Sequence, residues 1–498
     1  MKQSNLALLI AFLTTGMTVV AAAESKPNII YILADDLGYG DVHCLNPQRG
    51  KIKTPHLDRL AAQSMVFTDA HAATSVCSPT RYGVLTGRYA WRTRLQKGVL
   101  LNESPPLIAP DRLTVPKLLK RHGYRTAGFG KWHLGLDAPL RGGDILVDQL
   151  IRNGPVTRGF DSYFCSDFRL FAPFMFVEGD RFAGQPLIDR TKVGVKNDGG
   201  PALKPDDFSH ILPTVCDRAV AKLGEFATEN QPFFLYLAPG APHDPYAPTE
   251  AWKGKSGLGS YADYVMETDA EIGRVLEALE KNDLATNTLI IFTSDNGCAP
   301  YAGVKQMEAK GHYPSADKRG YKSDIWEGGH RVPFMVCWPG KVRVGTTNSQ
   351  TICLTDLMAT CAEVLGEKLP DDAGEDSVSL LPILKGQTQP SLHDAVVHHS
   401  LDGSFAIRQG KWKLVFCSGS GGWGAPENGS KQAQGLPPIQ LYDLAADPSE
   451  KNNVQGGHPE VLNALTALMG KYVANGRSTP GAPQKNDVKV NFQTKANQ

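Results

Sequence analysis

The chain has 498 residues, with 52 Lys or Arg against 51 Asp or Glu, so its formal net charge at pH 7 is +1. This balance, without any run of basic residues, excludes a broad positive field of the kind that holds nucleic acid, and we expect no nucleic-acid partner. A chain of this length can bury a large core in one big domain or divide into as many as three ordinary domains.

The N-terminus has the order of a secretory signal. Lys2 is followed by an apolar run over residues 6–20 and by three alanines at 21–23. We therefore predict a signal peptide over residues 1–23 and an exported protein, either periplasmic or secreted. A membrane anchor is the alternative, but the run is short and interrupted by polar residues. No later segment is apolar enough to span a membrane, so we expect no span once the signal is removed.

Apolar runs alternate with amphipathic stretches along the chain, which indicates an α/β fold. Continuous apolar runs predict buried parallel strands, and apolar positions that recur every three or four residues predict helices. The expected strands are 28–34 (NIIYILA), 233–238 (FFLYLA) and 289–293 (LIIFT), and the expected helices are 113–122, 211–227 and 261–284. We predict a doubly wound, mainly parallel sheet flanked by helices over residues 24–390, which binds its ligands beyond the carboxyl ends of the strands.

The pattern changes after about residue 390, where short runs predict a small antiparallel sheet with one helix over residues 391–475. The expected strands are 395–399, 405–408, 411–416 and 440–444, and the expected helix is 459–473. The stretch 418–438 is rich in Gly and Pro, and residues 476–498 are polar, so we expect a flexible tail there.

Carboxylates follow two of the predicted strands. Asp35 and Asp36 come directly after residues 28–34, and Asp295 and Asn296 follow the strand at 289–293. Carboxylate and amide oxygens select a hard cation such as Ca²⁺ or Mg²⁺ over Zn²⁺. Each Asp could instead cap a helix after its strand, but two matching strand ends favour a metal site.

A single cysteine, Cys77, precedes a predicted helix whose first turn contains Pro79. Unpaired N–H groups and the helix dipole favour an anion at this position, and Arg81, one turn later, adds a forked donor suited to sulfate or phosphate. A buried structural cysteine is the alternative, but it gives no reason for Arg81. Nine cysteines are present, an odd number that leaves an even set if one is used in chemistry, and their connectivity cannot be read from the sequence.

These residues resemble the type I, formylglycine-dependent sulfatase family of the alkaline phosphatase-like superfamily. The resemblance lies in the order CSPTR followed by LTGR, GKWHLG and WEGGHRVP, and it runs from about residue 27 to at least residue 444. The corresponding residues are 77–81, 85–88, 130–135 and 326–333. Several long motifs in one order leave little room for chance matching.

The resemblance implies a role for each matching residue. Cys77 matches the residue that a maturation enzyme oxidises to Cα-formylglycine, and one Ca²⁺ ion would be bound by Asp35, Asp36, Asp295, Asn296 and residue 77. Arg81 matches the residue that steadies the aldehyde hydrate and its sulfate, Lys131 and His133 match residues that flank the nucleophile, His243 matches the leaving-group acid and Lys322 matches a sulfate-binding lysine.

Some assignments keep a plain alternative. Lys322 could belong to a solvated basic loop with Lys318 and Arg319, and His243 could be an ordinary loop histidine. A polar residue near the sulfate could be Ser162 or one of residues 165–167. Three further residues could line the substrate pocket or lie on the surface, and they are His312, Asp324 and His330.

The resemblance therefore predicts a Ca²⁺-dependent sulfatase that hydrolyses an ester of a sulfated carbohydrate. Two alternatives remain. One is a phosphate or phosphonate monoester hydrolase of the same superfamily, and the other is a carbohydrate-binding protein on an inactive scaffold. Every predicted catalytic position carries a chemically competent residue, which counts against the second.

Overall fold

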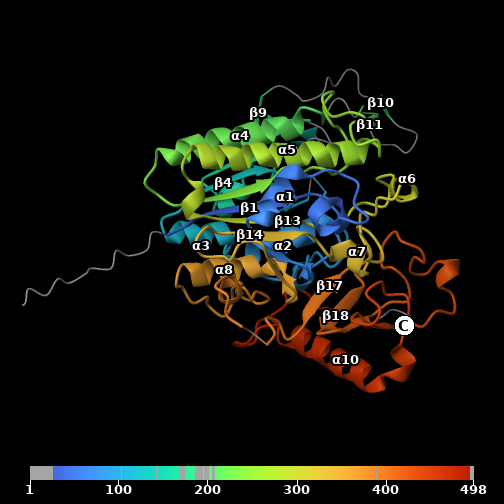
Figure 1. Ribbon diagram of the computed structural model, residues 1–498. Coiled ribbons are helices and arrows are strands. Elements are labelled where there is room, and N and C mark those ends of the chain that lie inside the picture. The colour runs from blue at the N-terminus through green and yellow to red at the C-terminus, as the bar shows by residue number, and fades with distance from the viewer. Residues whose placement is uncertain are drawn as a thin grey trace, which may run out of the picture.

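A computed structural model describes residues 26–493 apart from gaps at 102–103, 142–143, 168–173, 185–193, 196–200, 203, 205–207 and 389. The predicted signal peptide at 1–23 lies outside the described residues. Figure 1 shows a central sheet between two layers of helices, with the C-terminal part packed below. No described helix has the length and apolar character needed to cross a membrane.

The central sheet is mixed but mostly parallel, as predicted. Its ten strands lie in the order β15-β2-β14-β13-β1-β12-β4-β7-β8-β9, and the five from β13 to β7 are mutually parallel. These five are β13 (Thr288–Ser294), β1 (Asn28–Ala34), β12 (Phe233–Ala238), β4 (Arg125–Gly130) and β7 (Ser162–Cys165). The outer strands are β15 (Thr346–Asn348), β2 (Met65–Phe67), β14 (Phe334–Cys337), β8 (Phe176–Glu178) and β9 (Arg181–Ala183).

The side chains of β1 pack alternately into two hydrophobic cores, one on each face of the sheet. Ile29, Tyr31 and Leu33 pack into one core, and the intervening Ile30 and Ile32 pack into the other. The first core is covered by α2 (Cys77–Thr86), α3 (Val115–Arg121) and α8 (Leu357–Val364), and the second by α1 (Pro55–Ala62), α4 (Ile211–Ala227) and α5 (Ser260–Lys281). Burial on both faces explains why β1 reads as a continuous apolar run.

The helices follow the predicted positions, with differences at their ends. α4 has the predicted bounds, and α5 ends three residues early, just before Asp283, which has a positive φ of 56°. α3 begins at Val115 because Thr114 caps it, its hydroxyl accepting a hydrogen bond from the backbone N–H of Lys117. Shorter helices are α6 (Val304–Ala309), α7 (Glu327–His330) and α9 (Leu381–Leu384).

The C-terminal part forms the predicted antiparallel sheet with a helix. The strands pair in chain order, and they are β17 (Val396–His399), β18 (Phe405–Gln409), β19 (Trp412–Val415) and β20 (Gln440–Asp443). Helix α10 (Pro459–Ala474) packs against β18 and β19. β17 also joins the main domain, because the His399 N–H donates to the carbonyl of Ala73, four residues before Cys77. We call residues 391–475 the C-terminal subdomain.

Small paired strands complete the described fold. They are β3 (Ala70–His71) with β16 (Ile352–Cys353), β5 (Leu140–Arg141) with β6 (Asp144–Ile145), and β10 (Gly194–Val195) with β11 (Pro201–Ala202). All nine cysteines are among the described residues, and each is a free thiol.

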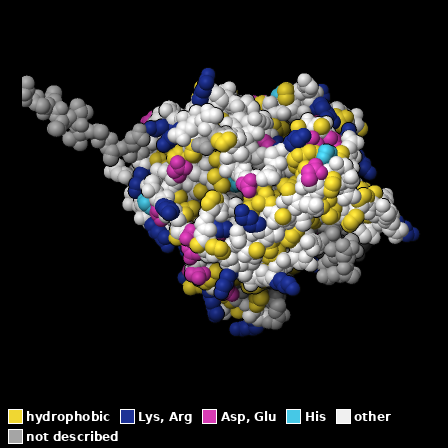
Figure 2. Space-filling view, turned by 90° about the horizontal axis from the view of Figure 1, so that it is seen from below, with side chains coloured by type: hydrophobic (Ala, Val, Ile, Leu, Met, Phe, Trp, Pro, Cys, Tyr) yellow, Lys and Arg dark blue, Asp and Glu magenta, His cyan; other side chains and the backbone are white. Residues whose placement is uncertain are grey.

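The segment after α10, expected from its composition to be a flexible tail, makes specific contacts over the described residues 476–493. Asp487 forms an ion pair with Arg88, and the Phe492 ring meets the Phe416 ring edge-on at 5.2 Å. On the face drawn in Figure 2, basic and acidic side chains are interspersed instead of gathered by sign, in keeping with the balanced net charge.

Candidate active site

The predicted carboxylates meet at the carboxyl ends of β1 and β13. These strands pair in register, Ala34 opposite Ser294, so that Asp35 and Asp295 follow side by side. The Asp36 N–H donates to Asp295 Oδ1 at 3.2 Å, and the Asn296 amide donates to Asp36 Oδ1 at 2.7 Å. All four residues are fully buried. The structure thus gathers residues 260 positions apart into one oxygen-rich cluster.

Each carboxylate is paired with a buried cation from another segment. The pairs are Lys131 Nζ with Asp35 Oδ2, Lys322 Nζ with Asp36 Oδ2, and Arg81 Nη2 with Asp295 Oδ2, each at 2.7 Å. Lys322 is only 4% exposed, so its alternative placement in a solvated basic loop is wrong. Three cations therefore converge on the carboxylate cluster.

Two features of the cluster fit an oxygen-bound cation. Burial, and after it the negative charge of Asp35, raise the pKa of Asp295 well above its usual range despite the ion pair with Arg81. The buried Oδ1 of Asn296 has no hydrogen-bond partner. Asp36 also has a left-handed backbone, with φ of 66°, a strain that proteins tend to keep at functional sites. The donor set is that of a hard cation such as Ca²⁺.

Cys77 is the first residue of α2, and its side chain is buried beside the cluster. Its sulfur lies within 4.8 Å of a carboxylate oxygen of both Asp35 and Asp295. Arg81, one helical turn later, is fully buried and donates from Nη1 to the carbonyl of Lys131 at 3.0 Å. The first turn of α2 thus aims a thiol and a guanidinium at the same carboxylates.

A cavity of about 260 Å³ opens above Cys77. It is lined by four more of the predicted catalytic residues, Lys131, His133, His243 and Lys322, whereas Arg81 lies outside the lining. Of the polar residues that the sequence left open, Ser166 and Asp167 also line the cavity, whereas Ser162 does not. The remaining lining residues are Val76, Val99, Leu100, Leu101, Tyr301, Leu401 and Trp423.

The two histidines of the cavity have different environments. His133 is half-buried, and burial of its ring together with the charge of Lys131 lowers its pKa to about 3, so the ring is neutral. Its Nε2 lies 2.8 Å from the carbonyl of Leu100, which fixes the proton there and leaves Nδ1 as a buried acceptor without a hydrogen-bond partner. The His243 side chain is 16% exposed, and its Nε2 lies 3.8 Å from Asp36 Oδ2.

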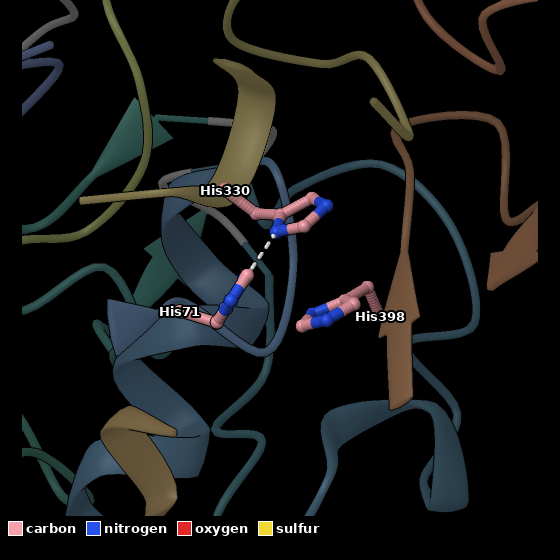
Figure 3. A group of neighbouring side chains, drawn as sticks. All are labelled: His71, His330 and His398. Atoms are coloured by element: carbon pink, nitrogen blue, oxygen red, sulfur yellow. Dashed lines mark hydrogen bonds between the residues drawn. The ribbon is translucent and has the colours of Figure 1, made fainter. Parts of the chain in front are cut away.

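For three residues the sequence allowed either a place in the pocket lining or a place on the surface, and the structure shows neither. None lines the cavity, and all are buried. His312 pairs with Asp41 at 2.8 Å, and Asp324 accepts from the N–H of Gly424. Figure 3 shows His330 beside His71 and His398: its Nδ1 is 3.0 Å from that of His71, and its ring stacks on His398 with centroids 3.9 Å apart.

Sequence reasoning missed the aromatic residues of the cavity. Tyr301 follows the metal-ligand motif by five residues, and Trp423 lies in the stretch rich in Gly and Pro at 418–438. No periodicity or spacing in the sequence marks either residue. A tryptophan within a stretch rich in Gly and Pro was the one available signal, since a large aromatic side chain in a surface loop often marks a binding site.

Comparisons with known proteins agree with the geometry. A family model described as Sulfatase matches residues 27–367. The chain is 35% identical to an N-acetylgalactosamine-6-O-sulfatase of Bacteroides thetaiotaomicron, covering 90% of this chain and 93% of that protein. It is 32% identical to human arylsulfatase A, covering 90% and 88%. A solved structure from work on glycosaminoglycan metabolism by Bacteroides thetaiotaomicron is 33% identical, with a TM-score of 0.78 and coverage of 90% and 99%.

Proposed function

Since this chain belongs to the sulfatase family, we propose that it hydrolyses sulfate esters of a carbohydrate and that Cys77, once oxidised, supplies the nucleophile. One observation carries the proposal. The thiol at the start of α2 lines a cavity together with Lys131 and Lys322, whose amino groups pair with the carboxylate cluster. A sulfate group needs such a ring of buried positive charge, and a nucleophile beside it.

Two groups that the family uses fit the residues present. Cα-formylglycine, made from Cys77 by a maturation enzyme, would supply a hydrate whose hydroxyl attacks sulfur. One Ca²⁺ ion, held by Asp35, Asp36, Asp295, Asn296 and residue 77, would supply positive charge beside the sulfuryl oxygens. The raised pKa of Asp295 and the unpartnered Asn296 Oδ1 support the ion.

The side chains of the cavity have separate tasks in this proposal. Lys131 and Lys322 neutralise the sulfuryl oxygens, and Arg81 holds the carboxylate cluster in place through Asp295. His243, the more exposed histidine, donates a proton to the leaving oxygen, a contribution on the order of 10² to 10⁴ in rate. His133 accepts a proton at Nδ1, which burial keeps unprotonated.

The substrate class follows from the relatives. The curated relative with 35% identity is named for a sulfated amino sugar, and a solved structure with 25% identity and a TM-score of 0.69 is a complex with a neocarrahexaose. We infer a sulfated saccharide as substrate. The charge and apolar order of residues 1–23 supports export to the periplasm or beyond.

The test is a comparison of hydrolysis rates on an aryl sulfate and the matching aryl phosphate, followed by a screen of sulfated saccharides. The protein is produced with and without a formylglycine-generating enzyme, and the Cys77 peptide is weighed in each preparation. We expect activity only where the peptide is oxidised, and faster turnover of the sulfate. Faster phosphate turnover would favour a phosphomonoesterase. Oxidised protein that is inactive on every sulfate ester would favour a binding protein.

A further inference from the structure

Two aromatic side chains stand exposed at the cavity above Cys77. Tyr301 is 52% exposed and Trp423 is 43% exposed, and their ring centroids lie 5.7 Å apart at an interplanar angle of 57°. Both line the cavity, as does the exposed Leu101. A large apolar side chain that stays in water contributes little to the stability of the fold. Three such side chains grouped at one opening therefore indicate a binding site. We call Tyr301 and Trp423 the aromatic rim.

The backbone that carries Trp423 is fixed to the segment that carries Lys322. The Trp423 N–H donates to the hydroxyl of Ser323 at 2.9 Å, and Ser323 in turn donates its N–H to the carbonyl of Ser75 at 2.8 Å. Ser323 has a φ of 82°, a strained value for a residue with a side chain. One strained residue thus ties the tryptophan to the segment leading into Cys77 and to its own neighbour, Lys322.

Glycines on both sides of Trp423 allow this close approach. A Cβ at Gly422 would lie 2.4 Å from the Ser323 carbonyl, and a Cβ at Gly424 would lie 2.4 Å from Asp324 Oδ2. The Gly424 N–H also donates to Asp324 Oδ1 at 2.8 Å. The loop is therefore seated on residues 323–324 on both sides of the tryptophan, while the indole itself stays exposed.

We propose that the aromatic rim binds a pyranose ring of the substrate, and that the C-terminal subdomain is thereby part of the saccharide site. This inference rests on the proposed function. A pyranose has an apolar C–H face that packs on aromatic rings while its hydroxyls remain in water, and the neighbouring cavity wall is mostly apolar. The anchor through Ser323 sets the distance between the ring on Trp423 and the sulfate at Lys322.

The experiment measures binding separately from catalysis. In a Cys77→Ala background, which cannot turn over, calorimetry gives the affinities of N-acetylgalactosamine 6-sulfate and of inorganic sulfate. We expect Trp423→Ala and Tyr301→Ala each to weaken saccharide binding about tenfold, the size of one aromatic stacking contact, and to leave sulfate binding unchanged. Trp423→Phe should restore most of the affinity.

A matched control lies in the same loop region. Leu436 is 42% exposed but does not line the cavity, so Leu436→Ala should change neither affinity. The proposal would be overturned if Trp423→Ala bound the saccharide as tightly as its Cys77→Ala parent. It would also be overturned if that parent bound inorganic sulfate but no saccharide. If the rim variants lose saccharide binding while oxidised wild-type protein hydrolyses no sulfate ester, the rim stands and the proposed catalysis falls.

Discussion

The molecule contains two buried charge clusters of the same size that differ in the residues that surround them. The first, the pocket cluster, consists of Asp35, Asp36 and Asp295 with Arg81, Lys131 and Lys322. The second, the subdomain cluster, consists of Asp69, Glu327 and Glu450 with Arg331, Arg408 and Lys413. Each sets three carboxylates against three cations. The pocket cluster lies at the cavity that Cys77 lines, whereas four residues of the subdomain cluster line a separate cavity of about 450 Å³, and they are Asp69, Glu327, Arg331 and Arg408.

Two acids of the subdomain cluster are held in the ionised form by their partners. Asp69 accepts two hydrogen bonds from the Arg408 guanidinium, at 2.7 and 2.8 Å, and also pairs with Arg331. Although burial opposes ionisation, the charge of Arg331 holds the pKa of Asp69 far below its usual range, and Lys413 does the same for Glu327. Each cluster also contains one acid whose pKa is raised, chiefly by burial: Glu450 in the subdomain cluster and Asp295 in the pocket cluster.

The two clusters together show that buried charge alone does not mark an active site. The subdomain cluster joins the two parts of the chain, since Arg408, Lys413 and Glu450 come from the C-terminal subdomain, and its charges are satisfied there. The pocket cluster lies next to the cavity that Cys77 lines, and the neighbouring Asn296 keeps a buried Oδ1 without a hydrogen-bond partner. A carboxylate cluster with an unpartnered oxygen, next to a cavity lined by a thiol and two lysines, is the arrangement expected of a site that binds a cation and an anionic substrate.

The largest effect is expected at the pocket. Cys77→Ala should lower kcat/KM on an aryl sulfate by about 10⁴-fold or more, because the covalent step is lost. Its melting temperature should stay within about 2 °C of wild type, since the packing around α2 remains. Cys44, the exposed thiol, provides the control, and Cys44→Ala should change neither quantity. Near-normal turnover by Cys77→Ala would refute the role of residue 77.

Removal of calcium should affect the pocket cluster both chemically and structurally. A chelator should lower activity about 100-fold or more, and should lower the unfolding free energy by about 3 kcal/mol, as expected for loss of a ligand held well above its Kd. The stability shift should also occur in Cys77→Ala, which has no activity to lose, and it should vanish in Asp295→Asn. Protein that keeps its activity and stability after chelation and exhaustive dialysis would contradict the assigned ligands.

Much of this pocket could be predicted because its residues follow local patterns. Strands β1 and β12 have the predicted bounds, since strands buried on both faces read as continuous apolar runs. The role of the acids that follow β1 and β13 is then expected from the rule that ligands bind beyond the carboxyl ends of parallel strands. The motif around Cys77 supplied the rest through resemblance to a family.

The subdomain cluster could not be predicted in the same way. Asp69 and Arg408 are 339 residues apart, and His71 and His330 are 259 apart, so no local period relates them. Nothing in the single sequence distinguishes a buried arginine in a strand from an exposed one. For the same reason Trp423, whose position depends on contacts with Ser323, lies in a segment that composition marks only as a loop.

Removing one charge of the subdomain cluster should lower the unfolding free energy and leave the catalytic activity nearly unchanged. Glu327→Gln leaves Lys413 and Arg331 short of a buried negative charge, so we expect the unfolding free energy to fall by about 3 to 5 kcal/mol. Activity per folded molecule should remain within a few-fold of wild type. Glu250→Gln is the control: its side chain is 85% exposed beside Lys253, and about 0.5 kcal/mol is the expected limit. A Glu327→Gln variant as stable as wild type would undo the contrast between the clusters.

The smallest expected effect is on acid stability at the interface with the C-terminal subdomain. His399 in β17 is buried with neither ring nitrogen hydrogen-bonded, and burial lowers its pKa from 6.5 to about 4. His399 binds a proton near pH 6.5 in the unfolded chain but only near pH 4 in the folded chain. The folded state is therefore not destabilised by this group above pH 6.5. Stability falls as the pH drops toward 4, by about 3 kcal/mol for this one group.

Urea denaturation between pH 4 and pH 8 measures this loss. His399→Phe keeps the aromatic packing beside Phe405, with rings 6.1 Å apart, and removes the titrating group, so its stability should fall about 3 kcal/mol less than that of wild type between pH 7 and pH 4. His458→Gln replaces a histidine whose side chain is 40% exposed and should leave the wild-type profile intact. If the unfolding free energies of His399→Phe and wild type depend on pH in the same way, protonation of His399 does not contribute to the acid sensitivity. That sensitivity then arises elsewhere in the chain.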